Sequence, residues 1–521
     1  MTTHLLVIDA GTGSGRAVVF DRAGNQIGFA QEEWRHLPED GVPGSMSFDV
    51  DGGWALLRRC IAKALEACGL DGGDIAAISA TSMREGIVLY DEAGKEVWAV
   101  ANVDSRSSAE VAELKARSAD FERRFYEISG ETFALGALPR LNWLRRHQPE
   151  TFARARTLSM INDWIGARLT GEIAVEPTNG STNGLMDLST RDWSDILIAE
   201  AGLDRSLFPR IVEPGTVVGR VTRAAAEETG LAEGTPFVAG GGDVQLGAVG
   251  LGLVELGDAA VLGGTFWQQV VNIPQGTVDP TMRVRINSAA PQGMNQAEAI
   301  SFFVGLTARW FRDVFCGEEV RIAAERGLDA YDLMEDLAMQ APPGANGIIP
   351  VFSDAMDFGK WYHAAPSLLN LSIDPAIANK GSIFRAIQEN AAVVAAVNLD
   401  RVEEFAKVDS SGPVTLAGGA SKGRLWPQIV ADVTGRQLRI PKVREATALG
   451  GAAAAAVGIG QFDSLREAGR DFVKWDRRVD PDPANRAVYD DARGRWEKAY
   501  AAQRKLVDEG ITTSMWRAPG T

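Results

Sequence analysis

The sequence predicts an α/β protein built from two similar halves, and three observations support this prediction. The segment Leu5–Asp21 reads as a buried strand, a glycine-rich turn and a second strand. The segment Ala259–Asn272 repeats that arrangement 253 positions later. The matching residues are Val261, Gly264, Thr265 and Val271, which correspond to Ile8, Gly11, Thr12 and Val18. Elsewhere, apolar strands that end in polar residues alternate with segments of helical spacing.

Length and composition limit the classes of function. A chain of 521 residues has room for about two to four domains. The net charge of −16 argues against a nucleic-acid partner, which requires a basic surface. Cys60, Cys68 and Cys316 cannot form a disulfide framework and lack metal-site spacing, so we expect the reducing cytoplasm. The longest apolar runs are Ala-rich and too short to cross a bilayer, so we expect no membrane association.

The opening hairpin has the residues of a polyphosphate site. Glycines at positions 11, 13 and 15 let backbone N–H groups approach an anion closely. Thr12 and Ser14 add hydroxyl donors, and Arg16 adds a permanent cation. Asp9, at the end of the first strand, is placed to hold a hydrated Mg²⁺. The pattern therefore favours a nucleotide polyphosphate.

Two other interpretations of this hairpin stay open at this point. A dinucleotide fingerprint also has three alternating glycines, but it requires a helix after them, whereas Ala17–Asp21 favours a strand. A plain hairpin with a glycine-rich turn is the simpler alternative. The lysine-containing phosphate loop of P-loop proteins is not present in this stretch.

Polar residues follow the next strands. After a helix over Trp54–Cys68, the strand Ile75–Ala80 runs into Arg84 and Glu85, which could bind hydroxyl and carbonyl oxygens. The alternative for this adjacent pair is an ordinary surface ion pair. Strands are also predicted at Ile87–Tyr90 and Val97–Val100. The second of these is followed by Asn102 and Asp104.

The rest of the first half leads to a candidate base. The pattern predicts mostly helix over 108–162, a loop or β-hairpin over 176–192 and a connecting segment over 214–233. A strand at Phe237–Ala239 then meets three glycines and Asp243. An aspartate fixed at a glycine-rich strand end suits a general base. The alternative is that Asp243 is the N-cap of the helix that follows.

The second half repeats the pattern without the metal carboxylate, because Leu262 replaces Asp9. We expect the domain boundary near 251–257, giving domains 1–252 and 253–521. Helices are predicted over 303–315 and 382–405. A strand, Gly418, Gly419 and a helix follow, which suit a purine ring and its phosphates. Another Ala/Gly-rich helix begins near Glu445, and the tail from about 461 is polar and helical.

With these stretches in view, the sequence resembles the FGGY carbohydrate kinases. Five motifs occur in the order and spacing of that family: DAGTGSGRAVVFD, SMREG, GGGD, GGTF and GGASKGRLWPQIVAD. The resemblance covers nearly the whole chain. It implies two actin-like (ribonuclease-H-like) domains around a deep cleft, with substrate and phosphates bound by the first domain and adenosine by the second. It also implies ATP and Mg²⁺ as cofactors.

The resemblance assigns roles to the candidate residues. Asp243 would be the catalytic base, and Asp9 would position Mg²⁺. The acceptor would contact Asp243 and four further residues, which are Arg84, Glu85, Asn102 and Asp104. ATP would contact ten residues, which are Thr12, Gly13, Ser14, Arg16, Gly264, Thr265, Gly305, Gly418, Gly419 and Lys422.

The acceptor implied by the resemblance is the open-chain signal molecule 4,5-dihydroxypentane-2,3-dione, phosphorylated on its primary hydroxyl. Asn102 stands where many relatives carry a tryptophan, which favours a more polar pocket than that of an ordinary sugar kinase. Another sugar or polyol, such as a ketopentose or glycerol, is the alternative acceptor. A homodimer and a regulatory phosphocarrier protein also stay open as partners.

Two further classes of function compete with a kinase. An actin-like ATPase that works as a binding or assembly module would hydrolyse ATP without an acceptor, and would not need Arg84 and Glu85. A dehydrogenase would need a helix directly after Gly15.

Overall fold

The first half of the chain is organised around a six-stranded sheet. The computed structural model describes residues 3–355, 362–443, 445–518 and 520. In spatial order the strands are β10 (Val217–Arg220), β11 (Pro236–Gly242), β4 (Ile75–Ser82), β1 (His4–Ala10), β2 (Ser14–Asp21) and β3 (Gln26–Glu33). The central strand β1 pairs antiparallel with β2 and parallel with β4. Its residues Leu5–Ile8 are fully buried, as their apolar run predicts.

A seven-stranded sheet organises the second half. Its strands, in spatial order, are β14 (Arg285–Ser288), β15 (Met294–Ser301), β13 (Trp267–Pro274), β12 (Ala259–Gly263), β18 (Val414–Gly418), β19 (Leu438–Pro441) and β20 (Trp475–Val479). The strand β12 pairs antiparallel with β13 and parallel with β18, just as β1 pairs with β2 and β4. The predicted repeat of two similar α/β halves is therefore confirmed.

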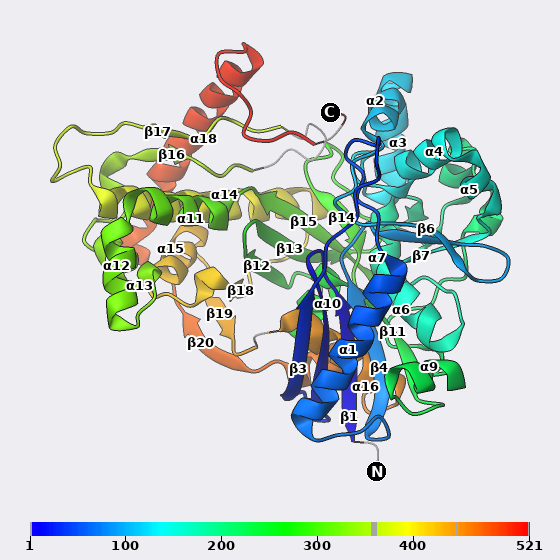
Figure 1. Cartoon of the computed structure of the whole chain (residues 1–521). Helices are drawn as coiled ribbons and strands as arrows, with labels where there is room; N and C mark the ends of the chain where they lie inside the picture. The colour runs from blue at the N-terminus through cyan, green and yellow to red at the C-terminus, as the bar shows by residue number, and fades with distance from the viewer. Residues whose placement is uncertain (1–2, 356–361, 444, 519, 521) are drawn as a thin grey trace.

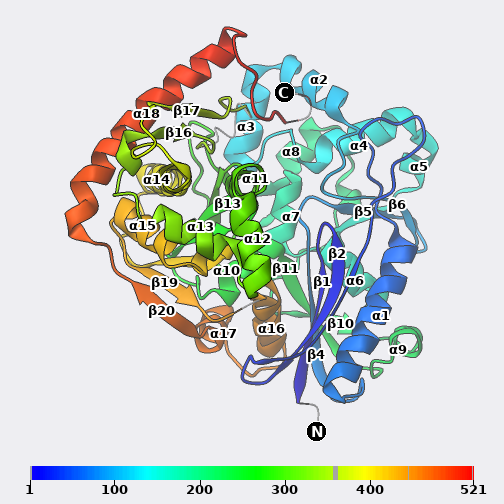
Figure 2. The same ribbon diagram turned by 60° about the vertical axis from the view of Figure 1, so that its left-hand side comes forward.

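Helices α10 (Asp243–Gly250) and α16 (Ala446–Gly458) lie between the two sheets (Figure 1). They pack closely because glycines face each other's backbone: a Cβ on Gly450 would stand 1.9 Å from the carbonyl oxygen of Leu246. Helices α1 (Val50–Cys68) and α14 (Lys380–Ala406) lie on opposite sides of the molecule, with both sheets between them (Figure 2).

An outer lobe extends the first half (Figure 1, upper right). It contains a three-stranded sheet and has its own apolar core, which includes Phe125, Phe133 and Trp193. The strands of the lobe are β5 (Ile87–Tyr90), β6 (Glu96–Val100), β7 (Thr157–Met160), β8 (Met186–Asp187) and β9 (Asp192–Trp193). Its helices are α2 (Ser108–Arg117), α3 (Ala119–Ser129), α4 (Ala137–His147), α5 (Pro149–Arg154) and α8 (Asp195–Glu200).

The remaining elements pack on the two sheets or on the helices that cover them. On the first half these are α6 (Ile161–Thr170), α7 (Pro177–Gly180), α9 (Arg223–Thr229) and α17 (Leu465–Phe472). On the second half they are α11 (Val304–Phe315), α12 (Gly317–Arg326), α13 (Ala330–Ala338), α15 (Leu425–Thr434), α18 (Arg486–Asp508), β16 (Ile349–Val351) and β17 (Ser367–Leu369). In the described part of the chain, no helix is both long enough and apolar enough to cross a membrane.

Several local predictions need correction. The strand β2 begins directly after the glycine turn, so the dinucleotide fingerprint is wrong, and with it the dehydrogenase. The predicted connecting segment 214–233 contains β10 and α9. The stretch 108–162 is mostly helical, as predicted, and also contains the short strand β7. The tail is not purely helical, because β20 joins the edge of the second sheet through β19.

Candidate active site

The predicted site residues lie at the carboxyl ends of strands in both sheets. Asp9 is next to the end of β1, Arg84 follows β4, and Asp243 follows β11. In the second sheet, Gly264 follows β12 and Gly418 ends β18. Parallel pairing of β1, β4 and β11, and of β12 with β18, brings these ends to one edge of each sheet. The two edges meet beside α10 and α16.

The turn of the opening hairpin is fixed at its base and open at its tip. The Gly11 N–H donates to the Ser14 carbonyl oxygen at 3.0 Å, which closes the turn. Trp34 Nε1 donates to the Gly11 carbonyl oxygen at 3.1 Å, and His36 Nε2 lies 2.6 Å from that of Thr12. Thr12 and Gly13 are exposed, whereas Ser14 is buried. The tip therefore offers its groups to a ligand on a preformed scaffold, and the Ser14 hydroxyl is the least accessible of them.

Asp9 is a buried carboxylate in a cluster of like charge. Arg16 Nε lies 3.2 Å from Asp9 Oδ2, and Arg16 Nη1 donates to Glu445 Oε2 at 2.7 Å. Burial raises the pKa of Asp9 to about 7; Arg16 opposes this, and the charges of Asp243 and Glu445 add to it. Asp9 Oδ1 is buried and has no hydrogen-bond partner among the residues that the structure describes. A cation near Asp9 would lower its raised pKa and would give Oδ1 a partner.

Asp243 opens helix α10 at the floor of the cleft. Its Oδ1 accepts from the N–H of Val244 at 2.8 Å and lies 3.5 Å from Arg84 Nε. The helix N-cap is Gly242, so the interpretation of Asp243 as an N-cap is wrong. Its side chain keeps 40% of its surface exposed, unlike the fully covered Asp104. Burial raises the pKa of Asp243, Arg84 lowers it, and Glu85 raises it further.

Arg84 and Glu85 are buried, and each pairs with a residue of the second half. Arg84 binds Glu298 with both terminal nitrogens, Nη2 at 3.1 Å from Oε1. Glu85 Oε1 lies 2.5 Å from Arg285 Nη1. Their interpretation as an ordinary surface ion pair is therefore wrong. Sequence reading missed Glu298 and Arg285, since neither stands in a recognisable motif.

Asn102 and Asp104 have different surroundings. Asn102 Nδ2 donates to Thr12 Oγ1 at 2.9 Å, so this residue lies beside the turn of the opening hairpin. The side chain of Asp104 is fully covered and accepts from the Met46 N–H at 2.6 Å and from Arg106 Nε at 2.8 Å. Contact of Asp104 with an acceptor would require breaking these bonds. We therefore expect Asp104 to act on the acceptor indirectly, by holding the loop at Met46 in place.

A cavity of about 350 Å³ in the second half suits a nucleotide base. Its walls include Trp267, Trp426 and Phe384, and its rim includes five predicted ATP contacts, which are Gly264, Thr265, Gly305, Gly419 and Lys422. Glu335, which sequence reading missed, lines the same cavity. It accepts from the backbone N–H groups of Arg424 and Leu425 at 3.0 and 2.8 Å, so it fixes the turn after Gly419. Its position in an ordinary amphipathic helix gave no signal.

A second cavity of about 360 Å³ adjoins the first and leads to Asp243. Gly263 and Gly264 line both cavities. Glycine is required where their walls meet: a Cβ on Gly305 would stand 2.4 Å from the Gly264 carbonyl oxygen. Gly418 has φ +91°, and its Cβ would stand 2.3 Å from the Gly263 carbonyl oxygen. The two cavities thus form one tract from the aromatic walls to the catalytic candidate.

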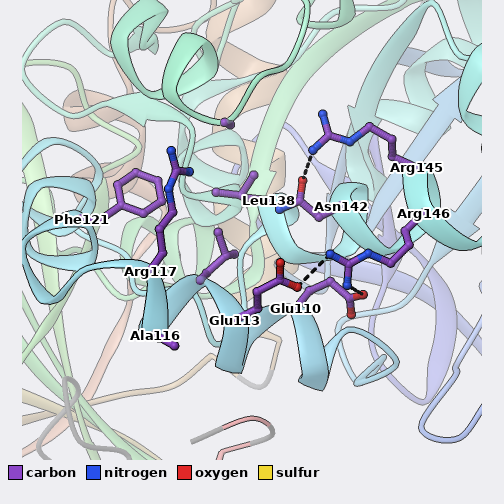
Figure 3. Close-up of a pocket in the computed structure, with 11 residues that line it drawn as sticks. Glu110, Glu113, Ala116, Arg117, Phe121, Leu138, Asn142, Arg145 and Arg146 are labelled. Atoms are coloured by element: carbon purple, nitrogen blue, oxygen red, sulfur yellow. Dashed lines mark hydrogen bonds and ion pairs between the residues drawn. The ribbon is translucent and has the colours of Figure 1, made fainter.

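A separate cavity of about 500 Å³ lies in the outer lobe, between α2 and α4 (Figure 3). Its cations are engaged within the protein. Arg146 Nη2 donates to Glu113 at 2.8 Å, and Arg145 Nη2 donates to Asn142 at 3.0 Å (Figure 3). Arg117 lies over the ring of Phe121. The predicted site residues all lie elsewhere.

The comparisons of this sequence with known proteins agree with one another. Residues 4–250 match the model of the N-terminal domain of the FGGY family of carbohydrate kinases, and residues 270–459 match that of its C-terminal domain. An autoinducer-2 kinase of Enterobacter sp. (strain 638) is 54% identical over 99% of this chain and 98% of that protein. One from Klebsiella pneumoniae is 53% identical over 99% of this chain and 97% of that protein.

Solved structures agree in fold. A xylulose kinase from Rhodospirillum rubrum superposes with a TM-score of 0.85 at 23% identity, covering 97% of this chain and 100% of that one. The Plasmodium falciparum glycerol kinase with ADP superposes with a TM-score of 0.80 at 20% identity, covering 96% of this chain and 98% of that one. These similarities confirm the predicted fold class of two actin-like domains.

Proposed function

This chain belongs to the FGGY family of carbohydrate kinases, and from this premise we propose that it is an autoinducer-2 kinase. The family makes it a phosphotransferase with an alcohol acceptor and ATP as the phosphate donor. The proposed acceptor is open-chain 4,5-dihydroxypentane-2,3-dione, and the product is its 5-phosphate. The family and the similarity to autoinducer-2 kinases over nearly the whole chain support this choice.

The observation that carries the proposal is the tract from the aromatic cavity to Asp243. A nucleotide whose base lies near Trp426 can extend its phosphates past Gly263 and Gly264 toward the cleft floor. There it would meet the exposed turn at Thr12 and Gly13. An acceptor beside Arg84 would then have its hydroxyl between Asp243 and the terminal phosphate.

The proposed chemistry is in-line phosphoryl transfer. Asp243 accepts the proton of the primary hydroxyl as its oxygen attacks the γ-phosphorus. The bond from that phosphorus to the β–γ bridging oxygen breaks, and ADP leaves. Backbone N–H groups of the turn after Asp9 and of the Gly264 loop stabilise the charge on the transferring group. Arg84, 3.5 Å from Asp243, favours the ionised form of that carboxylate and orients it.

The residues around Asp9 fit a magnesium ion. Hard carboxylate oxygens are the ligands that Mg²⁺ takes, usually together with water and phosphate oxygens. Asp9 offers an unpartnered Oδ1 within the described chain. Among the described residues, no cluster of three or more acidic, His or Cys side chains is arranged to hold a metal alone. Asp9 would therefore share the ion with phosphate and water, and the ion would neutralise phosphate charge.

Other finer predictions stay proposals. We assign acceptor and phosphate binding to residues 1–252 and adenosine binding to 253–521. The cytoplasm stays a prediction from cysteine content. A homodimer and a phosphocarrier partner stay open.

The test is a coupled ADP-release assay with the purified full-length protein. We expect ADP release that depends on the dione and yields one equivalent of phosphorylated product. The panel includes a ketopentose, glycerol and a reaction without acceptor. Faster turnover of a ketopentose or glycerol would replace the proposed substrate, and equal ADP release without acceptor would indicate an ATPase instead.

A further inference from the structure

One buried face of β14 and β15 is polar where a sheet core would be apolar. Arg285 pairs in register with Glu298, and Asn287 with Gln296, so all four side chains project from the same face. Each of them is at most 2% exposed. Burying polar groups is costly unless they bind partners. This face, the polar wall, therefore requires a physical reason.

The polar wall lies against the acceptor side of the first half. Glu298 binds Arg84, which lies 3.5 Å from Asp243. Arg285 lies 2.5 Å from both Glu85 and Glu131. A single side chain, that of Arg84, thus connects the polar wall to the candidate base Asp243.

Part of this wall is unsatisfied. Within the part of the chain that the structure describes, Arg285 Nη2, Asn287 Oδ1 and Gln296 Oε1 are buried and have no hydrogen-bond partner. The same holds for Glu131 Oε2, on the facing side. Such atoms require a partner, and a ligand bound beside Arg84 and Glu85 would supply one here. The group contains both a donor and acceptors.

We propose that the polar wall is the specificity-determining surface of the acceptor pocket, which binds the oxygen atoms of a small open-chain carbonyl compound with neighbouring hydroxyl groups. This inference rests on the proposed function. Arg285 Nη2 donates to a carbonyl oxygen, while Asn287 Oδ1 and Gln296 Oε1 accept from hydroxyls. Acceptor selectivity then lies in the second half as well as in Arg84 and Glu85.

The chemistry predicts which molecules the wall rejects. A site built to hydrogen-bond a substrate oxygen discriminates strongly against an analogue that lacks it, because the buried groups stay unpaired. Glycerol lacks a carbonyl oxygen for Arg285. The wall therefore disfavours simple polyols.

The experiment compares two asparagines on adjacent strands. Asn287 is on the polar wall, whereas Asn295 projects from the opposite face of β15. Asn295 is equally buried and also has unpartnered side-chain atoms in the described chain, so it controls for the loss of a buried asparagine that does not face Glu85 and Arg84. We expect Asn287→Ala to raise KM for the dione about tenfold, the effect of about one hydrogen bond. Its KM for ATP should change less than about twofold. Asn295→Ala should leave the ratio of the two KM values as in the wild type.

A second measurement guards against loss of folding. The dione should raise the thermal midpoints of the wild type and of Asn295→Ala. It should raise the thermal midpoint of Asn287→Ala by a smaller amount. Glu298→Gln, which keeps the shape of the side chain, should lower the preference for the dione over glycerol. An unchanged KM for the dione in a folded Asn287→Ala protein would overturn the inference.

Failure of the proposed function gives a different result. If the wild type phosphorylates a ketopentose and not the dione, the proposed substrate is wrong, and the same pair of variants is compared with the ketopentose. A rise in the KM for that acceptor in Asn287→Ala alone supports the wall. Equal KM values in both variants overturn it.

Discussion

Asp243 differs from the buried carboxylates of the cleft in how its charge is balanced. Glu298 binds Arg84 through two hydrogen bonds, which hold its pKa below the usual range against the effect of burial. Asp243 has only a longer contact with Arg84 and a backbone N–H. Burial therefore prevails and raises its pKa. A carboxylate that is basic and exposed to the cleft is the better proton acceptor.

We predict that Asp243→Asn lowers kcat by about 10²–10⁴-fold, because an amide cannot take the hydroxyl proton. The fold should persist, since the amide oxygen can still accept from the Val244 N–H. The measurement is steady-state turnover of the dione, with the thermal midpoint as control for folding. Turnover close to that of the wild type would reject Asp243 as the base.

The pH dependence of kcat/KM should reflect the ionisation of Asp243. The base works only when deprotonated, so kcat/KM is lost as pH falls through its pKa. Because that pKa is raised, the acid limb should lie above pH 3.8, the usual value for aspartate. Arg84 favours the charged form, so Arg84→Gln should move the limb to higher pH. A limb that does not move, in a variant that still folds, would contradict this coupling.

Single-residue patterns predicted which side chains gather at the cleft better than they predicted their partners. Arg84 and Asp243 follow strand ends, which a local pattern reveals. Glu298 is 214 positions from Arg84, and only the pairing of whole sheets brings them together. Local sequence reading has no access to such a contact, so the charge state of the pocket could not be predicted.

Among the strands, β12 and β18 determine the junction of the nucleotide tract. The two strands run parallel, and Gly263 lies opposite Gly418 in their register. Gly418 has the positive φ that side chains resist, and it touches the backbone of Gly263. The junction therefore depends on the lack of a Cβ at this position.

We predict that Gly418→Ala weakens ATP binding. The left-handed backbone costs about 1–3 kcal/mol, and the collision with Gly263 moves the two strands apart. KM for ATP should rise about tenfold or more, while KM for the dione changes less. The measurement is initial rate against ATP concentration.

Gly412→Ala is the matched control for that change. Gly412 lies just before β18, and no atom of the described chain is within 4 Å of the position of its Cβ. This variant should retain the KM of the wild type for ATP. Equal behaviour of the two variants would show that the close approach of β12 and β18 does not shape the nucleotide site.

Strands were predicted well where burial makes them apolar. Ile87–Tyr90 was predicted as a strand, and β5 has those bounds. The edge strand β20 was missed because its sequence WDRRV is polar, and none of its residues is fully buried. The same applies to β10, whose four residues are all at least partly exposed. Edge strands face solvent, so their pattern resembles that of loops.

For the molecule as a whole, the two halves of the chain are not two separate cores. Helices α16 and α17 come from the second half of the sequence, yet they cover the face of the first sheet that carries Leu5, Val7 and Val18. The Ala-rich sequence of α16 lets it lie close to β1. The boundary near residue 252 stays a prediction. It describes the sequence repeat better than the packing.

We predict that a fragment of residues 1–252 does not fold alone. Without α16 and α17, Leu5, Val7, Val18 and Phe20 lose a covering layer that leaves each at most 2% exposed. Full burial of such side chains contributes about 1.5–3 kcal/mol each, so losing that layer from four of them costs up to about 6–12 kcal/mol. This is comparable to the whole stability of an ordinary domain, about 5–15 kcal/mol.

Far-ultraviolet circular dichroism and urea unfolding of the 1–252 fragment test this prediction. A fragment that ends at 252 and unfolds cooperatively would show that the first sheet does not need the helices of the second half. Soluble, folded material only on co-expression with residues 253–521 would support the shared core, and with it a cleft whose two walls cannot form independently.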